Sequence, residues 1–334
     1  MRLGQSAART DPGRKRRHNE DSYVCRPPLF AIADGMGGAR AGEVASALAA
    51  GALSESRANG GGTRLVVELI QEANRRVHAR ASTDAETSGM GTTITVALVE
   101  SDGSVTFGHV GDSRAYLLRS GALEQITDDH SLVAELVRRG ELSAQDAEAH
   151  PQRSVITRAL GTDPDVDVDA FSMQAEDGDI FLICSDGLSD MIGGEQIEQI
   201  MRQQRGDLDA AARELIQAAN RAGGDDNITA ILFEMVAGEQ ATEPDEQTRE
   251  LTPGHLGAAT LDEEDTLHPE DRVAPPPPAG DTMVVPAEQI QLALAEQAEP
   301  EAARAGLGRR LLALGVIAAL VAIIVALVWW GLAR

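Results

Sequence analysis

Cysteine is almost absent from this sequence, since Cys25 and Cys184 are its only two copies. Two unpatterned cysteines predict neither a disulfide framework nor a thiolate metal site. Positive charge is also scarce: 29 Lys and Arg stand against 53 Asp and Glu, for a formal net charge of −24. This balance argues against a nucleic-acid partner, and the basic cluster Arg14 to Arg17 is too short to change that. No signal-like apolar segment begins the sequence, so any membrane anchor is expected elsewhere.

A long acidic stretch divides the chain. Residues 237–303 hold 16 Asp or Glu against two Arg, together with Pro275 to Pro278 and almost no aromatic side chains. Such a composition cannot bury enough apolar surface to fold, so we expect an extended, disordered linker. Residues 1–236 instead mix apolar periodic segments with glycine-marked turns and are long enough to bury a core. We therefore predict a folded domain at 1–236, a linker at 237–303 and a third segment at 304–334.

The third segment contains a long apolar run. Residues 311–332 carry no charged or strongly polar side chain, and 22 residues rising about 1.5 Å each span a hydrocarbon core of about 30 Å. We predict a single transmembrane helix; a buried core helix is the weaker alternative, because nothing follows the run to bury it. Arginines on one side predict a single-pass cell-membrane protein whose folded domain is cytoplasmic. The flanking residues are Arg304, Arg309 and Arg310 before the run and Trp329 and Trp330 at the far interface.

Periodicity in the folded domain alternates between helix and strand. Two long helical patterns precede many short strands that form an antiparallel meander, and two more helices precede a closing strand. This order predicts the α+β class. Helices are expected at 42–56, 63–82, 131–139, 143–148, 195–204 and 208–221, and strands at 22–25, 29–33, 93–100, 105–109, 115–119, 123–127, 166–173, 179–184 and 227–236.

Two apolar runs end in Asp followed by Gly. The first leads into Asp34-Gly35 and the second into Asp186-Gly187. Buried strands fix side chains firmly, and glycine lets backbone and ligand approach closely, so the pair indicates an oxygen-ligand metal centre. One isolated Asp-Gly is more often a hairpin turn, so neither copy decides the matter alone.

Further carboxylates occur in equally distinctive settings. Asn19-Glu20-Asp21 follows the basic run, Gly111-Asp112 follows a strand pattern, Asp190 lies one helical turn after Asp186, and Gly223 to Asn227 precede the last strand pattern. In this order the motifs form a known series. The first 236 residues resemble the metal-dependent, phosphatase 2C-type serine/threonine protein phosphatases, and especially the bacterial members that oppose membrane receptor-type serine/threonine kinases.

The resemblance implies an α-β-β-α sandwich of two antiparallel sheets flanked by helices, and a centre of two Mn²⁺ or Mg²⁺ ions. Such hard ions keep several waters, so a few carboxylates suffice and no His or Cys cluster is needed. The ligands it implies are Asp34 bridging both ions, Gly35 through its carbonyl, Asp186 and Asp226 on the first ion, and Glu20 on the second, with Asp21 orienting coordinated water.

The resemblance also implies a third, weaker metal. It would lie at Asp112 and Asp186, with Asp190 or a flap oxygen such as Ser154 completing it. Other uses remain open, because Asp190 can cap a turn and Ser154 can be a helix N-cap.

Arg16, four residues before Glu20, matches the family's phosphate-binding arginine, whose planar fork can take two phosphate oxygens. The alternative is a solvated surface arginine. Met36 stands where animal members have a His proposed to protonate the leaving alkoxide, and a thioether cannot donate a proton. The general acid is therefore not identified. His109, within an alternating strand pattern, is expected to be a packed or surface side chain.

These observations predict a membrane-anchored, Mn²⁺- or Mg²⁺-dependent phosphatase that dephosphorylates phosphoserine and phosphothreonine by direct attack of a metal-bridging hydroxide. Its expected partners are phosphorylated proteins, in particular a membrane serine/threonine kinase and its substrates, which a shared membrane would concentrate. One alternative is a catalytically silent phosphoprotein-binding scaffold, which should lack a core ligand; Glu20, Asp34, Asp186 and Asp226 are all present. Another is a phosphatase specific for a phosphorylated anti-sigma-factor antagonist, although such relatives usually carry an added sensor domain.

Overall fold

The computed structural model describes residues 1–37, 41–56, 60–84, 87–238 and 283–284. All of them belong to one compact unit, Met1–Val284. The predicted transmembrane segment at 311–332 lies outside these ranges and stays a prediction. Most of the predicted linker also lies outside them, but its residues 283–284 form a short strand that pairs with Val155–Ile156 of the folded domain, so the linker is not extended and unpaired throughout. Among the described residues, no helix combines the length and apolar character needed to cross a bilayer.

Most strands lie close to the ranges that the periodicity predicted. They are β1 (Arg2–Asp11), β2 (Asp21–Arg26), β3 (Leu29–Met36), β4 (Gly91–Thr92), β5 (Ile94–Val99), β6 (Ser104–Val110), β7 (Arg114–Arg119), β8 (Ala122–Gln125), β9 (Val155–Ile156), β10 (Asp169–Gln174), β11 (Ile180–Cys184), β12 (Ile228–Val236) and β13 (Met283–Val284).

The helices also follow the prediction, with the four-residue α5 added after β11. They are α1 (Ala41–Glu55), α2 (Gly62–Thr83), α3 (Leu132–Arg138), α4 (Ala144–Glu148), α5 (Asp186–Ser189), α6 (Gly194–Gln203) and α7 (Leu208–Ala222).

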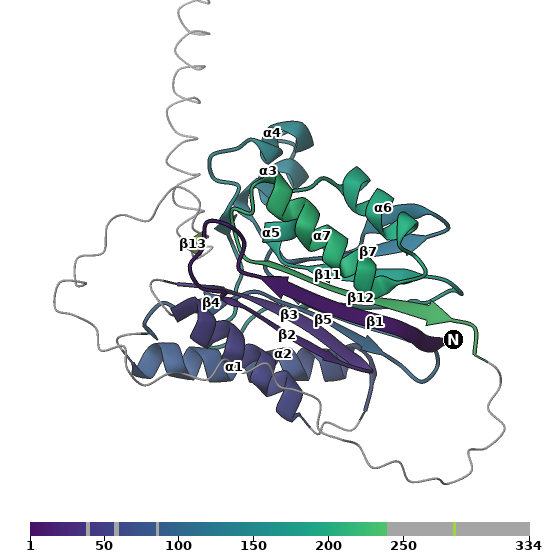
Figure 1. Cartoon of the computed structure of the whole chain (residues 1–334). Coiled ribbons are helices and arrows are strands. Elements are labelled where there is room, and N and C mark those ends of the chain that lie inside the picture. The colour runs from purple at the N-terminus through teal and green to yellow at the C-terminus, as the bar shows by residue number, and fades with distance from the viewer. Residues whose placement is uncertain (38–40, 57–59, 85–86, 239–282, 285–334) are drawn as a thin grey trace, which may run out of the picture. The chain divides into compact units, whose positions relative to one another are not determined.

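Two antiparallel sheets stack face to face, and helices cover their outer faces (Figure 1). One sheet has the order β1-β12-β11-β7-β8, and the other has the order β10-β6-β5-β3-β2, with β4 attached to β3. Helices α1 and α2 cover the second sheet, while α6 and α7 cover the first (Figure 1). The predicted α-β-β-α sandwich is therefore confirmed.

Apolar side chains fill the three spaces between the four layers of the sandwich. Strand residues alternate between faces, so Ala31 and Ala33 of β3 pack on α1 and α2, while Phe30 and Ile32 face the other sheet. Phe30 stacks on Phe233 of β12 with ring centroids 4.5 Å apart. Aromatic side chains bury large areas and pack well as offset or stacked pairs, so the inter-sheet layer contributes much of the stability.

Strand β1 was not predicted. Its sequence, RLGQSAARTD, is polar and small, with no run of aromatic or β-branched side chains. It becomes a strand because it pairs with β12 along its length, from Arg2 opposite Val236 to Asp11 opposite Ile228. Tertiary pairing, rather than intrinsic propensity, therefore determines this element.

Candidate active site

The layer between the sheets changes from aromatic to polar at one end. Along β3, the face that carries Phe30 and Ile32 reaches Asp34 next. Asp21 of β2 lies directly opposite Asp34 in the register of the sheet. The alternation of the strands therefore delivers carboxylates to the same edge of the layer. We call this region the carboxylate end, and its members are Asp21, Asp34, Asp112, Asp186 and Asp226.

Asp34 is fixed through its backbone. Its N–H donates to Thr93 Oγ1 (3.0 Å), and its carbonyl accepts from the Thr93 N–H (2.8 Å) and from the Thr92 hydroxyl (2.8 Å). Thr93 Oγ1 also lies 2.8 Å from Ser113 Oγ, with which it shares a hydrogen bond. The positions of Asp34 and of the turn that carries Asp112 are therefore coupled.

Three backbone segments converge on Gly35. A Cβ at this position would collide with the carbonyl oxygen of Gly42 at the start of α1 and would stand 2.7 Å from that of Glu20. Only glycine permits this approach. The Gly35 N–H donates to the Glu20 carbonyl (3.2 Å), so the predicted ligands Glu20, Asp34 and Gly35 occupy one corner.

Asp186 and Asp226 reach the carboxylate end from neighbouring strands. Asp186 begins α5 just after β11, and Asp226 lies in the turn between α7 and β12. Because β11 and β12 pair as far as Cys184 opposite Ala230, the two aspartates lie at the same end of the sheet.

Asn227 ties this end to the loop before β2. Its Oδ1 accepts from the Glu20 N–H (2.7 Å), and its Nδ2 donates to the carbonyl oxygens of Pro12 (3.0 Å) and His18 (2.9 Å). The amide of one residue therefore positions the loop that carries both Arg16 and Glu20.

Asp21 is held by two hydroxyl groups from the opposite sheet. Its Oδ2 accepts from Ser185 Oγ (2.8 Å) and Thr229 Oγ1 (2.6 Å). Burial raises the pKa of Asp21 to about 6 in spite of these bonds, which oppose the shift. Its other oxygen, Oδ1, is buried without a hydrogen-bond partner among the described residues.

The carboxyl groups of Asp34, Asp112 and Asp186 also resist ionisation. Burial, and then the charges of Asp21, Asp186, Asp226 and Asp112, raise the pKa of Asp34 well above its ordinary value. The pKa of Asp186 is raised in the same way by burial and then by neighbouring carboxylates. Burial raises the pKa of Asp112 to about 7. Buried like charges oppose one another, so this cluster needs a positive charge to be fully ionised at neutral pH.

The donor set fits hard divalent cations. The Oδ1 atoms of Asp21, Asp112 and Asp186 are buried without a hydrogen-bond partner among the described residues, and each such atom costs about 1–3 kcal/mol. Carboxylate oxygens are the ligands that Mn²⁺ and Mg²⁺ prefer. As the side chains stand, no three His, Cys, Asp or Glu residues in the described ranges are gathered closely enough to hold one ion.

Arg16 offsets part of the negative charge. Its Nη2 lies 2.7 Å from Asp226 Oδ2, and both side chains are largely buried. Neighbouring Arg14 and Arg17 are exposed. The structure therefore places Arg16 at the carboxylate end rather than among solvated surface residues.

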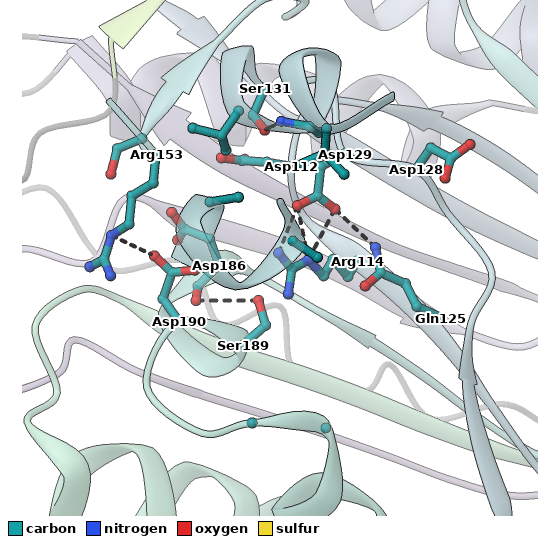
Figure 2. Close-up of a pocket in the computed structure, with 18 of the residues that line it drawn as sticks. Asp112, Arg114, Gln125, Asp128, Asp129, Ser131, Arg153, Asp186, Ser189 and Asp190 are labelled. Atoms are coloured by element: carbon teal, nitrogen blue, oxygen red, sulfur yellow. Dashed lines mark hydrogen bonds and ion pairs between the residues drawn. The ribbon is translucent and has the colours of Figure 1, made fainter. Parts of the chain in front are cut away.

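A cleft of about 670 Å³ opens beside the carboxylate end (Figure 2). Its lining includes Asp112, Asp186, Asp190, Arg153 and Ser154. The predicted residues of the third metal thus share one cleft.

Asp190 and Ser154 each had an alternative use. The Asp190 N–H closes the turn of α5 on the Asp186 carbonyl (2.7 Å), while its side chain lies 3.7 Å from Arg153 Nε (Figure 2). Asp190 therefore closes a turn with its backbone and faces the cleft with its carboxylate. Ser154 lies in the turn before β9 and is the N-cap of no described helix.

Met36 and His109 contribute no free proton donor. Met36 packs with Ile156 and Ala159. His109 is buried, its ring nitrogens bond to Thr95 Oγ1 (2.9 Å) and to the Asp128 carbonyl (3.1 Å), and burial lowers its pKa to about 3. The expectation that His109 is a packed side chain is confirmed.

Sequence reasoning did not single out Thr93, Asn227 or the buried His130, although all three fix the backbone around the site. Asn227 was the easiest to find, because it adjoins Asp226 in the motif Gly223 to Asn227. The signals at Thr93 and His130 are contacts between distant segments, which no local pattern reveals.

Comparison with known proteins agrees with this architecture. The family described as Protein phosphatase 2C matches residues 15–232. The serine/threonine phosphatase stp of Listeria innocua is 41% identical over 238 residues, which cover 68% of this chain and 94% of the relative. PstP of Mycobacterium tuberculosis is 41% identical over 233 residues, which cover 69% of this chain and 45% of that protein.

Solved structures lead to the same result. The crystal structure of Mycobacterium tuberculosis PstP/Ppp has a TM-score of 0.66 at 38% identity, and the match covers 70% of this chain and 100% of that one. A PstP catalytic domain in complex with two manganese ions has a TM-score of 0.65 at 36% identity, with 70% and 99% covered. The fold and the site together define a phosphatase of the kind that uses divalent metals. The chain belongs to the protein phosphatase 2C family and is a bacterial-type serine/threonine phosphoprotein phosphatase.

Proposed function

We propose that this chain hydrolyses phosphoserine and phosphothreonine in proteins with two Mn²⁺ or Mg²⁺ ions at the carboxylate end, and a third, weaker ion at Asp112. The observation that carries the proposal is the convergence of buried carboxylates, three of whose oxygens have no hydrogen-bond partner among the described residues. A relative solved with two manganese ions supports the choice of metal.

Five residues of the chain would bind the two ions. Asp34 would bridge the two ions, Asp186 and Asp226 would complete the first, and the Gly35 carbonyl and Glu20 would serve the second. When bound, the ions offset the charge of the phosphate and lower the pKa of a shared water, which supplies the attacking hydroxide at neutral pH.

Three further residues would position these groups. The Asn227 amide holds the Glu20 loop in place, and Asp21, anchored by its two hydroxyl donors, would orient coordinated water. The Arg16 guanidinium would donate to two phosphate oxygens, since its planar fork matches them.

We also propose that residues 311–332 anchor the enzyme in the cell membrane with the catalytic domain in the cytoplasm. The apolar length and the arginines before it support a single crossing in this orientation. The tether would raise the effective concentration of substrates on the same membrane, such as a serine/threonine kinase and its targets.

One assay tests the catalytic proposal. Residues 1–240, a span that matches nearly the whole of the Listeria enzyme, should release phosphate from a phosphothreonine peptide with Mn²⁺. Chelation should abolish turnover, and added Mn²⁺ should restore it. Asp34→Asn and Asp226→Asn should each lose turnover by orders of magnitude, whereas Asp165→Asn, at an exposed loop carboxylate, should match wild type. Full activity after exhaustive chelation would contradict the metal mechanism.

A further inference from the structure

His130 is a buried histidine next to the cleft that none of the roles above uses. It lies between β8 and α3, directly before Ser131, the N-cap of α3. Only 1% of its surface is exposed. A buried polar ring must satisfy its nitrogens, and the partners of His130 connect segments that adjoin the cleft residues Asp112 and Ser154.

The first partner is the turn that carries Asp112. The Gly111 N–H donates to His130 Nδ1 (3.0 Å), and the His130 N–H donates to the Gly111 carbonyl (2.8 Å). Both backbone polar groups of Gly111 therefore bond to one residue. Gly111 has φ +116°, and a Cβ there would stand 2.6 Å from Thr93 Cβ, so no other residue type fits this turn.

The second partner fixes the ring. Because Nδ1 accepts a hydrogen bond, the proton of the neutral ring is on Nε2, which lies 3.0 Å from its acceptor Asp169 Oδ2 and 3.1 Å from Arg158 Nη1. Arg158 Nη1 donates to the other oxygen of Asp169 (2.6 Å). Asp169 therefore selects the tautomer whose Nδ1 lone pair points at Gly111, as a carboxylate does for a metal-binding histidine.

The third partner is the segment that follows Arg153 and Ser154, two residues that line the cleft. The His130 carbonyl accepts from the Thr157 N–H (2.9 Å). Ser131, the next residue, forms an isolated antiparallel β-bridge with Ile156. His130 thus joins the Gly111-Asp112 turn to the segment that follows Arg153 and Ser154.

We propose that His130 is a positioning residue that holds the Gly111-Asp112 turn so that the Asp112 carboxylate can receive a divalent cation. The inference rests on the proposed role of Asp112. His130 itself touches neither the ion nor the phosphate, and it acts through the backbone of Gly111.

Two substitutions distinguish the hydrogen bond from Gly111 to the ring from the hydrogen bond between the ring and Asp169. In His130→Asn the amide oxygen can take the place of Nδ1 and still accept from Gly111. In His130→Gln the amide nitrogen can take the place of Nε2 and donate to Asp169, while the acceptor for Gly111 is lost. His109→Gln is the matched control: His109 is equally buried, its ring lies 4.8 Å from that of His130, and it makes no bond to Gly111.

The full chain in detergent serves for three measurements. Calorimetric titration of Mn²⁺ should show the weakest site loosened about 10- to 100-fold in His130→Gln, as for other residues that orient metal ligands, with the tighter sites unchanged. In metal-free protein, amide hydrogen exchange of the peptide that contains Gly111 should be faster. With a small phosphate ester, kcat should fall while KM stays within about twofold, because the phosphate contacts remain. His130→Asn and His109→Gln should stay close to wild type in all three.

Three results would overturn the proposal. Equal effects in all three variants, in proportion to lost thermal stability, would mean that the ring only fills space. Unchanged Mn²⁺ binding in His130→Gln, with weakened binding in Asp112→Ala, would refute the positioning role alone. If Asp112→Ala itself binds Mn²⁺ like wild type, Asp112 is not a metal ligand. The positioning role of His130, which depends on that ligand, is then wrong as well.

Discussion

The guanidinium of Arg16 donates to the carboxylate of Asp226 across 210 positions of sequence, with Nη2 2.7 Å from Oδ2. One member of this pair is the proposed phosphate ligand and the other is a proposed metal ligand. Binding of a cation and of a phosphate would give each a new partner of opposite charge. One hydrogen bond therefore joins the proposed phosphate-binding residue directly to a proposed metal-binding residue.

Replacing Arg16 tests its phosphate role. Arg16→Ala should lower kcat/KM for a phosphothreonine peptide about 10- to 100-fold, because charge-assisted hydrogen bonds contribute about 1.5–3 kcal/mol. Mn²⁺ binding, measured by calorimetry, should not weaken, since the change removes a positive charge beside Asp226. Arg17→Ala, one position along and exposed, is the control. Equal kinetics for Arg16→Ala and Arg17→Ala would mean that Arg16 does not bind the phosphate.

Replacing Asp112 tests the third metal. Asp112→Ala should lose the weakest Mn²⁺ in a calorimetric titration and reduce kcat moderately, while the two core ions stay bound. Asp128→Ala, at an exposed carboxylate that lines the same cleft, should leave both unchanged. Loss of every bound metal in Asp112→Ala would contradict the assignment.

Ionisation of Asp21 and Asp112 should make the metal-free protein less stable as pH rises. Burial raises the pKa of Asp21 from 3.8 to about 6 and that of Asp112 from 3.8 to about 7, so the native state holds protons that the unfolded chain has released. This contribution is complete below about pH 4 and is lost as pH rises through 6 and 7. Buried His109 acts in the opposite direction, because its lowered pKa makes the native state more stable as pH rises. In chelator, the change in Tm from pH 5 to pH 8 should therefore be more negative in wild type than in Asp112→Ala.

Added Mn²⁺ should reverse this trend, because it binds the ionised carboxylates and stabilises the native state. The gain in Tm on adding Mn²⁺ should be larger at pH 8 than at pH 5. Asp112→Ala, which lacks one of the titrating groups, should show a smaller fall with pH. Identical changes of Tm with pH in metal-free wild type and Asp112→Ala would show that ionisation of Asp112 does not destabilise the native state.

Deleting residues 304–334 tests the anchor. The truncated protein should leave the membrane fraction, and its turnover of a small phosphate ester should be nearly unchanged, since the deletion leaves the catalytic domain and the β13–β9 pairing intact. Dephosphorylation of a membrane-bound kinase should fall instead, through lost effective concentration. Retention in the membrane fraction, or loss of small-ester activity, would contradict a role as a tether alone.

Much of the fold follows from local patterns. The apolar run Phe30 to Ala33, followed by Asp34-Gly35, predicted a strand with a functional end, and the structure has β3 there with Asp34 between the sheets. The helical periodicity at 208–221 predicted α7 within one residue. The sequence patterns did not predict β1, because its residues lack strand propensity and depend on β12 for their hydrogen bonds.

The site was predictable only in part for a similar reason. Asp34, Asp186 and Asp226 each follow or precede an apolar strand, so their common end could be inferred. The contacts that position them are made between remote segments: Thr93 with Ser113, Asn227 with the loop at Pro12 and His18, and His130 with Gly111. Sequence spacing carries no information about such pairs.

The course of β12 has a practical consequence. Asp226 lies just before its first residue, Ile228, and the linker begins after its last, Val236, roughly 30 Å away at about 3.4 Å per residue. Arg2 pairs with Val236, so the chain enters and leaves the folded domain side by side, at the end remote from the carboxylates. A fusion partner or an immobilising tag at either point would therefore lie far from the carboxylate end and leave the cleft accessible to large phosphoproteins.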